Sequence, residues 1–157
     1  MRVVIDTNVL IAALTAPRSN GARVLTAWRQ GRFEVVSSKA TLREAELVLS
    51  AGWLSRLTTD QQVKSLLDEL RERTAMVRPR PVSDIPLKDE GDLRLVEAAL
   101  AGGAAYLVTA DREVLLQRGH AGIEFVKPAE FLRALGSRSI PDNERPSRGD
   151  STTIPDE

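Results

Sequence analysis

The side chains best suited to chemistry in this sequence are carboxylates that stand where a strand is expected to end or a helix to begin. The candidates are Asp6, Glu44, Asp92 and Asp111, with Asp89 as a fifth acid. Asp6 and Asp111 follow short apolar runs, whereas Glu44 and Asp92 belong to segments with helical periodicity. Oxygen ligands of this kind suit Mg²⁺ or Mn²⁺ and not zinc.

The chemistry follows if these acids meet in space. Carboxylates within a few ångströms of one another cannot all stay ionised without compensation, because each negative charge raises the pKa of its neighbours. Either some of them hold protons, or a divalent cation lies among them. A pair of such cations about 3.5–4 Å apart commonly activates water and stabilises the leaving oxygen at a phosphodiester.

Each acid also has an ordinary structural explanation. An aspartate at a helix start is commonly an N-cap worth about 1 kcal/mol, which alone would account for Asp89 or Asp92. Glu44 stands beside Glu46 and is compatible with a solvated helical face. Asp6, followed by Thr-Asn, is compatible with turn chemistry. The sequence leaves these alternatives open.

The elements that must position the acids alternate between strands and helices. Apolar runs predict strands near residues 3–5, 33–36, 76–77, 106–108 and 123–126. Helical periodicity covers residues 9–13 and 24–28, a segment after Ser38, another after Thr59, and a segment that ends at Gly102-Gly103. His120 is expected to lie in a loop.

This alternation favours a parallel sheet covered on both faces. We predict a three-layer α/β/α domain with a five-stranded parallel sheet over residues 1–136, followed by a mobile polar tail at 137–157. Ligands bind beyond the carboxyl ends of such strands, and the intervening helices begin on that same edge. All the candidate acids therefore map to one edge of the sheet.

Composition excludes several other chemistries. The chain has no cysteine and one histidine, so a disulfide framework, a thiolate metal site and a histidine-rich zinc site are ruled out. Residues 1–136 carry 19 basic and 17 acidic side chains, and residues 137–157 carry 3 and 5. Neither balance gives the basic footprint of a protein that binds nucleic acid by bulk electrostatics. No run is apolar enough to span a bilayer, so we expect a cytoplasmic protein.

Several blocks of the sequence resemble the PIN-domain nucleases. They are the opening Val4-Ile5-Asp6-Thr7-Asn8-Val9-Leu10, the run 31–38 with Glu44, and the runs 87–92, 98–104 and 106–112. They occur in order over about residues 2–132, which is more specific than any single motif. The sequence is most similar to the VapC-like toxin components of bacterial toxin–antitoxin pairs.

The resemblance implies a Mg²⁺- or Mn²⁺-dependent ribonuclease with the first and fourth strands at the centre of its sheet. By position, it implies that the metal is held by Asp6, Glu44, Asp92 and Asp111, with Asp89 in addition, and that the supporting groups are Thr7, Asn8 and Thr109. It also implies a small antitoxin partner and a homodimer, for which the stretch 51–54 and the helix after Thr59 are candidate surfaces. Glu90-Gly91 dilutes the third acidic block, which leaves open whether Asp89 or Asp92 is the principal ligand.

Arginines near the same edge are candidates for contact with substrate phosphate: Arg112, Arg18, Arg43 and Arg23. Ordinary surface arginines would look the same. Two other functions remain possible. One is a PIN fold that binds without turnover. The other is a phosphoacceptor receiver domain, which would require an acidic neighbour that Asp6 lacks.

Overall fold

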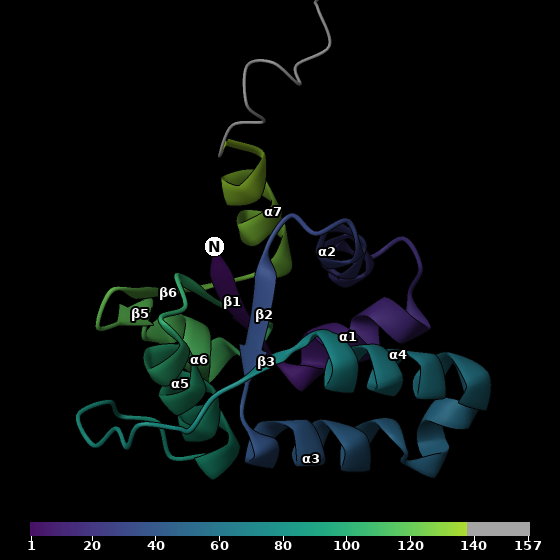
Figure 1. Ribbon diagram of the computed structural model, residues 1–157, viewed down its shortest axis with the longest axis horizontal. Helices are drawn as coiled ribbons and strands as arrows, with labels where there is room; N and C mark the ends of the chain where they lie inside the picture. The colour runs from purple at the N-terminus through teal and green to yellow at the C-terminus, as the bar shows by residue number, and fades with distance from the viewer. Residues whose placement is uncertain (138–157) are drawn as a thin grey trace, which may run out of the picture.

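One mostly parallel sheet organises the structure, a computed structural model that describes residues 1–137 (Figure 1). Its strands are β1 (Arg2–Ile5), β2 (Glu34–Ser37), β3 (Ala75–Met76), β4 (Tyr106–Val108), β5 (Gly119–His120) and β6 (Ile123–Val126). They stand in the order β3-β2-β1-β4-β6-β5. β1 and β4 are central, as the sequence resemblance implies, and every pairing except that of β5 with β6 is parallel.

The predicted α/β class is confirmed, but the predicted count of five strands is wrong by one. The extra strand is β5, which pairs antiparallel with β6 and includes His120, placed in a loop by the sequence. Gly119 and His120 belong to no apolar run, so the sequence carried no signal for this strand. The hairpin turn is built from Ala121 and Gly122, both at positive φ.

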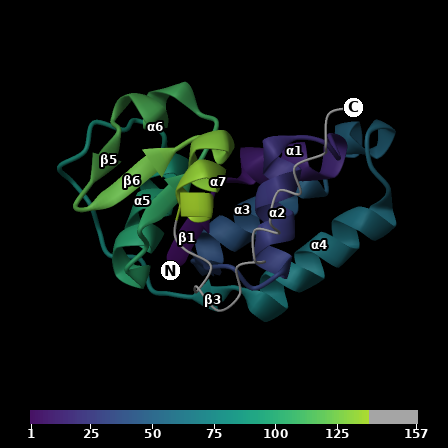
Figure 2. The same cartoon turned by 90° about the horizontal axis from the view of Figure 1, so that it is seen from above.

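Helices cover both faces of the sheet, because successive strand residues point to opposite sides. Val3 and Ile5 face α1 (Thr7–Thr15), α2 (Asn20–Arg29), α4 (Asp60–Arg73) and α7 (Pro128–Ser137). Val4 and Leu107 face α5 (Glu90–Gly102) and α6 (Arg112–Leu116). Figure 2 shows the two groups of helices on either side of β1. This arrangement confirms the three predicted layers.

The helix ends lie where the sequence signals predict. Ser38 caps α3 (Lys39–Leu49), and Thr59 forms a capping box with Gln62 at the start of α4. Gly103 ends α5 in the left-handed conformation, at φ 63°. The predicted helices after Ser38 and Thr59, and the predicted stop at Gly102-Gly103, are thus confirmed.

Helices α3 and α4 form a hairpin joined by the short helix η1 (Gly52–Arg56). The two helices run side by side in Figure 1, and Arg71 of α4 ties them together through Glu46 at 2.9 Å. Trp53, in η1, has 56% of its surface exposed, whereas Trp28 is buried in the core. The hairpin end therefore presents a large apolar side chain to solvent.

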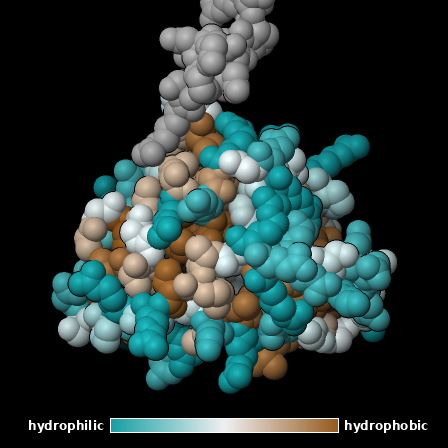
Figure 3. Space-filling model, viewed as in Figure 1, coloured by the Kyte–Doolittle hydropathy of each residue, from teal (hydrophilic) through white to brown (hydrophobic). Residues whose placement is uncertain are grey.

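The face shown in Figure 3 is mixed in character. Apolar side chains gather near its middle, where Figure 1 places β2 and β3, and hydrophilic side chains cover the side where α4 lies. Met76 of β3 is among the exposed apolar residues. The outer strand on this side of the sheet is thus only partly covered.

Two further sequence predictions concern the C-terminal tail and membrane-spanning segments. Ser137, placed at the start of the tail, is the last residue of α7, and the rest of the predicted tail lies outside the described residues. Among residues 1–137, no helix is long and apolar enough to cross a membrane.

Candidate active site

The carboxyl ends of β1 and β4 create the centre of the site. Ile5 pairs with Val108 in parallel register, so the next residues, Asp6 and Thr109, leave the sheet side by side. The backbone N–H of Asp6 still donates to the carbonyl of Val108, at 2.9 Å. Residues about one hundred positions apart are therefore held together by the strand ladder.

Side chains continue this ladder into a hydrogen-bond network around Asp6. The Thr109 hydroxyl donates to Asp6 Oδ2 at 2.8 Å and accepts the backbone N–H of Asp111 at 3.0 Å. Asn8 Nδ2 also donates to Asp6 Oδ2, at 3.3 Å, while Asn8 Oδ1 accepts the backbone N–H of Ala110 at 3.3 Å. Thr109 is fully buried, so its hydroxyl depends on these partners. Asp6 is thus fixed in place by the two supporting residues Asn8 and Thr109.

The start of α5 separates the roles of its two aspartates. Asp89 is the N-cap: its Oδ1 accepts the backbone N–H of Asp92 at 3.1 Å. Asp92 is only 9% exposed, and its carboxylate has no hydrogen-bond donor among residues 1–137. The capping explanation therefore accounts for Asp89 and does not account for Asp92.

Burial and neighbouring charge shift the acid–base properties of the cluster. Burial raises the pKa of Asp92 to about 7, and the negative charges of Asp111, Asp89, Asp6 and Glu113 add to the effect. Burial also raises the pKa of Asp6, partly offset by the hydrogen bond from Thr109. These acids are therefore close enough to oppose one another's ionisation.

Glu44 reaches the same place from α3, on the other side of Gly91. A Cβ atom added at Gly91 would lie 3.0 and 3.1 Å from the two oxygens of Glu44 and 2.9 Å from Asp89 Oδ1. Because Gly91 has no side chain, the carboxylates of Glu44 and Asp89 can both lie close to the backbone of α5. Glu44 has no hydrogen bond or ion pair within the described part of the chain.

A cavity of about 200 Å³ brings most of these residues together. Its polar lining is Asp6, Thr7, Asn8, Thr41, Glu44, Asp89 and Asp92, and its apolar wall is Ile11, Val48 and Leu95. Asp111 lies outside this lining. It caps α6, where its Oδ1 accepts the N–H groups of Glu113 at 2.8 Å and Val114 at 3.4 Å. Asp111 is linked to the cavity by the hydrogen bond from its backbone N–H to Thr109 and by the effect of its charge on Asp6 and Asp92.

The chemistry of the donor set fits a hard divalent cation. All the polar atoms lining the cavity that can act as ligands are oxygens, and no lysine or arginine within residues 1–137 forms an ion pair with any of the candidate acids. In those same residues, no three acidic or histidine side chains converge as metal ligands do. Asp6, Glu44, Asp89 and Asp92 line the cavity, and no ion pair in residues 1–137 compensates their charge.

The four predicted arginines lie in different places. Arg43 lines a groove beside Glu44, and Arg112 is the first residue of α6, directly after Asp111. Arg18 lies beyond the far end of α1, and Arg23 lines a separate hollow between α2 and α7. Only Arg43 and Arg112 thus adjoin the acids.

Sequence reasoning missed three contributors to the site. Thr41 lines the cavity one helical turn before Glu44, a spacing that places both on one side of α3. Glu113 raises the pKa of Asp92 and follows Asp111 by two residues. Gly91 seemed only to dilute an acidic block, and nothing in the sequence shows that Glu44 lies against it.

Comparisons with known proteins give a family match and similar solved structures. The PIN domain family matches residues 2–113. Curated proteins give no match. Among solved structures, VapBC2 from Rickettsia felis bound to a DNA fragment from its promoter is similar at a TM-score of 0.52 and 15% identity, over 81% of this chain and 98% of that one. FitAcB from Neisseria gonorrhoeae has a TM-score of 0.46 at 15% identity, over the same shares of the two chains.

The family match covers most of the chain and includes β1, α3, α5 and β4, which carry the candidate acids. It excludes a phosphoacceptor receiver domain. The order of the sheet and the family match lead to the same conclusion: this chain belongs to the PIN domain family.

Proposed function

We propose that the chain is a Mg²⁺- or Mn²⁺-dependent ribonuclease that hydrolyses RNA phosphodiester bonds. PIN domains are generally nucleases, and nucleases of this family typically use divalent metals. The observation that carries the proposal is the gathering of acids from the end of β1, from α3 and from the start of α5 around one cavity. Asp111, in the loop after β4, is coupled to them by its charge, and none of these acids has an ion-pair partner in residues 1–137.

The proposed metal ligands are Asp6, Glu44, Asp92 and Asp111, with Asp89 as a further acid. We infer that Asp92 is the principal ligand of its pair, because Asp89 is already engaged as the N-cap of α5. The bound ion would lower the pKa of a water molecule and stabilise charge on the phosphoryl oxygens.

The chain's own residues prepare this chemistry. Thr109 and Asn8 orient the Asp6 carboxylate, and Thr109 also holds the loop that carries Asp111. Thr7 lines the cavity beside them. Asp92 must lose its proton before it can bind a cation, so its raised pKa couples metal affinity to pH. We expect Arg43 and Arg112, which adjoin the acids, to contact phosphate, whereas the position of Arg18 beyond the far end of α1 does not support its proposed contact.

We further propose that this nuclease is the toxin of a type II toxin–antitoxin pair. The proposal is supported by the sequence resemblance to VapC-like proteins. The exposed apolar residues Trp53 and Leu57, at the end of the α3–α4 hairpin, offer a surface for an antitoxin or for a second copy in a homodimer. A toxin that cuts cellular RNA acts in the cytoplasm, which is the location we propose.

The direct test of the nuclease proposal is Asp6→Asn. We expect loss of metal-dependent RNA cleavage with an unchanged circular dichroism spectrum. Glu72→Gln removes the same charge at an exposed acid of α4 that does not line the cavity, and this variant is expected to cleave normally. Retained cleavage by Asp6→Asn would disprove the assignment.

Isothermal titration with Mn²⁺ separates the nuclease from a PIN fold that binds without turnover. If the wild-type protein binds Mn²⁺ and Asp6→Asn does not, the metal site is supported. If the wild-type protein does not bind Mn²⁺, the PIN fold without turnover is favoured. The toxin role is tested separately by expression in cells. We expect slower growth, relieved by co-expression of a small DNA-binding protein from the adjacent gene; normal growth without such a neighbour contradicts it.

A further inference from the structure

A second hollow lies beside the carboxylates, between α3 and α5. This groove has a volume of about 750 Å³ and is lined by Lys39, Ala40, Leu42, Arg43, Glu44, Glu46, Leu47 and Arg94. Glu44 lines both this groove and the cavity that holds Asp6 and Asp92. We call this second hollow the α3–α5 groove. Because Glu44 lines both hollows, a polymer that enters the cavity can continue into the α3–α5 groove.

The cations of the α3–α5 groove are available to a ligand. Lys39 and Arg43 have no ion-pair partner within residues 1–137. Arg94 lies 3.6 Å from Glu90, whose side chain is 84% exposed, and an exposed pair of this kind contributes little. The groove therefore presents three positive charges next to a cluster of acids.

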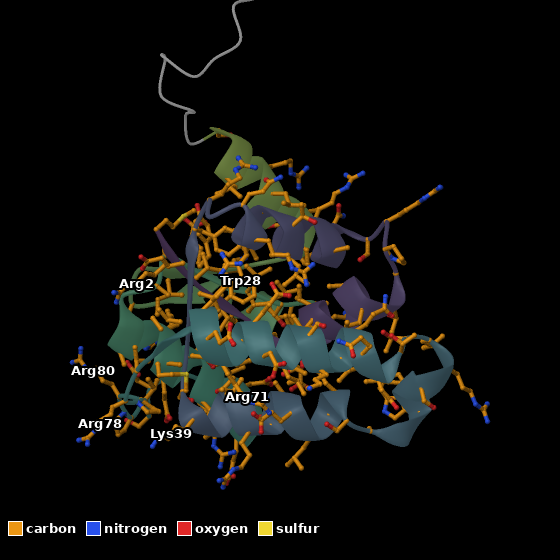
Figure 4. The ribbon with its side chains drawn as sticks, turned by 45° about the vertical axis from the view of Figure 1, so that its right-hand side comes forward. Arg2, Trp28, Lys39, Arg71, Arg78 and Arg80 are labelled. Carbon is orange, nitrogen blue, oxygen red and sulfur yellow. The ribbon has the colours of Figure 1, made fainter. Side chains whose placement is uncertain are left out.

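Two more cations extend this positive surface past the end of the sheet. Ser37 pairs with Met76 in parallel register, and the N–H of Val77 donates to the Ser37 carbonyl at 2.9 Å. Lys39 and Arg78 each follow a paired residue by two positions, so their backbones leave the sheet together. Figure 4 shows Lys39, Arg78 and Arg80 at one corner of the molecule.

Arg80 also connects this corner to α5. Its backbone N–H donates to the carbonyl of Glu97, at 3.4 Å. Glu97 lies one helical turn beyond Arg94, so the corner adjoins the end of the α3–α5 groove that Arg94 lines. The cations of two helices and of the segment after β3 thus form one connected surface.

The apolar side chains that line the groove distinguish between its possible occupants. Leu42 and Leu47 line it, and Leu47 is 71% exposed. Apolar side chains next to cations suit unpaired nucleobases with their phosphates, because the bases of a duplex are turned away from such a surface. A two-fold contact with a second copy through this surface would bring like charges together.

We propose that the α3–α5 groove binds the single-stranded RNA on one side of the scissile bond, with phosphates on Lys39, Arg43 and Arg94 and a base against Leu47. Arg78 and Arg80 receive the phosphates farther from the cavity. The proposal rests on the proposed ribonuclease function and assigns to it the direction in which the substrate leaves the carboxylates.

The test measures binding in EDTA, where no cleavage takes place. A short fluorescein-labelled single-stranded RNA is titrated with the protein at several salt concentrations and followed by fluorescence anisotropy. Lys39→Ala/Arg43→Ala/Arg94→Ala is expected to lose at least about tenfold in affinity, and the salt slope should fall by about 2, or about 0.7 for each lost phosphate contact. Leu47→Ser should weaken binding while leaving the slope unchanged.

The matched control is Arg32→Ala. Arg32 is exposed, has no ion pair in residues 1–137, and precedes β2 at the opposite edge of the sheet from Lys39. It should bind RNA as the wild-type protein does. Light scattering reports the mass of every variant, and thermal unfolding confirms that each is folded.

Three results would overturn the inference. The triple variant could bind like the wild type, it could lose affinity for an RNA duplex as strongly as for the single strand, or it could change the mass of the particle, which would make the groove a contact between copies. Metal-dependent cleavage by the wild-type protein, measured separately, shows whether the proposed function stands when the groove assignment fails. A wild-type protein that neither binds nor cleaves RNA overturns both.

Discussion

Asp92 is the residue in which burial and charge act together most strongly. Its position in the first turn of α5 would by itself favour the ionised form, because a helix N-terminus attracts negative charge. Burial and the surrounding acids outweigh that effect and raise its pKa to about 7. Without a cation, much of the protein therefore carries a proton on Asp92 near neutral pH.

This protonation gives a prediction for Asp92→Asn. The folded-state pKa of about 7 lies above the ordinary value of 3.8, so between these pH values the native state binds more protons than the unfolded state. The free energy of unfolding therefore falls as pH rises through this range. The amide of Asp92→Asn does not ionise, so the variant does not lose stability in this way as pH rises. In EDTA we expect equal stabilities near pH 3, below both pKa values, and at pH 8 a variant more stable than wild type by about 1–3 kcal/mol.

Urea unfolding at the two pH values measures this difference. Glu72→Gln, which removes an exposed acid of α4, should follow the wild-type profile throughout. Parallel pH profiles for Asp92→Asn and the wild type would show that the Asp92 carboxyl is ionised in the folded protein at low pH, contrary to its raised pKa.

Gly91 permits a second prediction at the scale of one residue. Alanine at this position suits a helix better by about 1 kcal/mol, but its Cβ atom meets the carboxylates of Asp89 and Glu44. Both are the ends of side chains that can rotate away. We expect Gly91→Ala to change the free energy of unfolding by less than about 1 kcal/mol and to weaken Mn²⁺ binding about tenfold, because Glu44 is displaced.

Calorimetric titration with Mn²⁺ and urea unfolding of the same preparation distinguish these effects. Gly136→Ala is a useful comparison, since a Cβ atom at Gly136 of α7 meets nothing within 4 Å. An unchanged Mn²⁺ affinity in Gly91→Ala would mean that Glu44 does not depend on the space beside Gly91.

At the scale of elements, the packing of α5 on β2 determines where Asp92 lies. Gly102 sits at the end of this helix, and a Cβ atom there would lie 2.9 Å from Val36 Cγ2 and 3.1 Å from Val36 Cβ. Val36 is fully buried in the sheet and cannot rotate away as a surface carboxylate can. The close approach of helix and strand therefore requires glycine.

We accordingly predict that Gly102→Ala lowers the free energy of unfolding by about 1–3 kcal/mol through overpacking. Gly136→Ala, also in a helix but facing open space, should raise it by about 0.5–1 kcal/mol. Chemical denaturation of the two variants gives opposite signs if the packing argument is right. A stabilised Gly102→Ala would show that α5 moves freely against β2.

The boundaries of strands and helices determine which site residues could be predicted from the sequence. Asp6 and Asp111 were identifiable because apolar runs mark strand ends, and parallel strands share an edge. The helix after Ser38 was identifiable from its cap and periodicity. The choice between Asp89 and Asp92 required the actual start of α5, which fixes the cap. β5 contains no apolar run that would mark it as a strand, and the contact of Glu44 with Gly91 depends on how two helices approach in space.

At the scale of the whole molecule, neutral composition conceals a separation of charge. Basic and acidic side chains are equal in number over the chain, yet acids gather around the cavity while Lys39, Arg43 and Arg94 line the adjacent α3–α5 groove. Such a distribution attracts a phosphate chain to the groove and repels it from the cavity unless positive charge is added there. Under the proposed function, a divalent cation would supply this positive charge and allow a phosphodiester to approach the acids.

The last prediction follows from this role of the cation. An ion that binds only the folded protein raises its stability by RT ln(1 + [L]/Kd), about 2.7 kcal/mol at one hundred times Kd. For a domain of this size that corresponds to a rise of about 5–10 °C in Tm. Because the ion must displace the proton of Asp92, its apparent affinity should fall up to about tenfold for each pH unit below 7.

Thermal unfolding with Mn²⁺ at pH 8 and at pH 5.5 tests this coupling, against sodium chloride of equal ionic strength. The rise in Tm should be large at pH 8 and small at pH 5.5, and Asp6→Asn should lose it at both, since Asp6 belongs to the same cluster. An equal rise at the two pH values would place the bound ion away from Asp92. In that case the acids around the cavity would be coupled to one another without being the ligands of the metal.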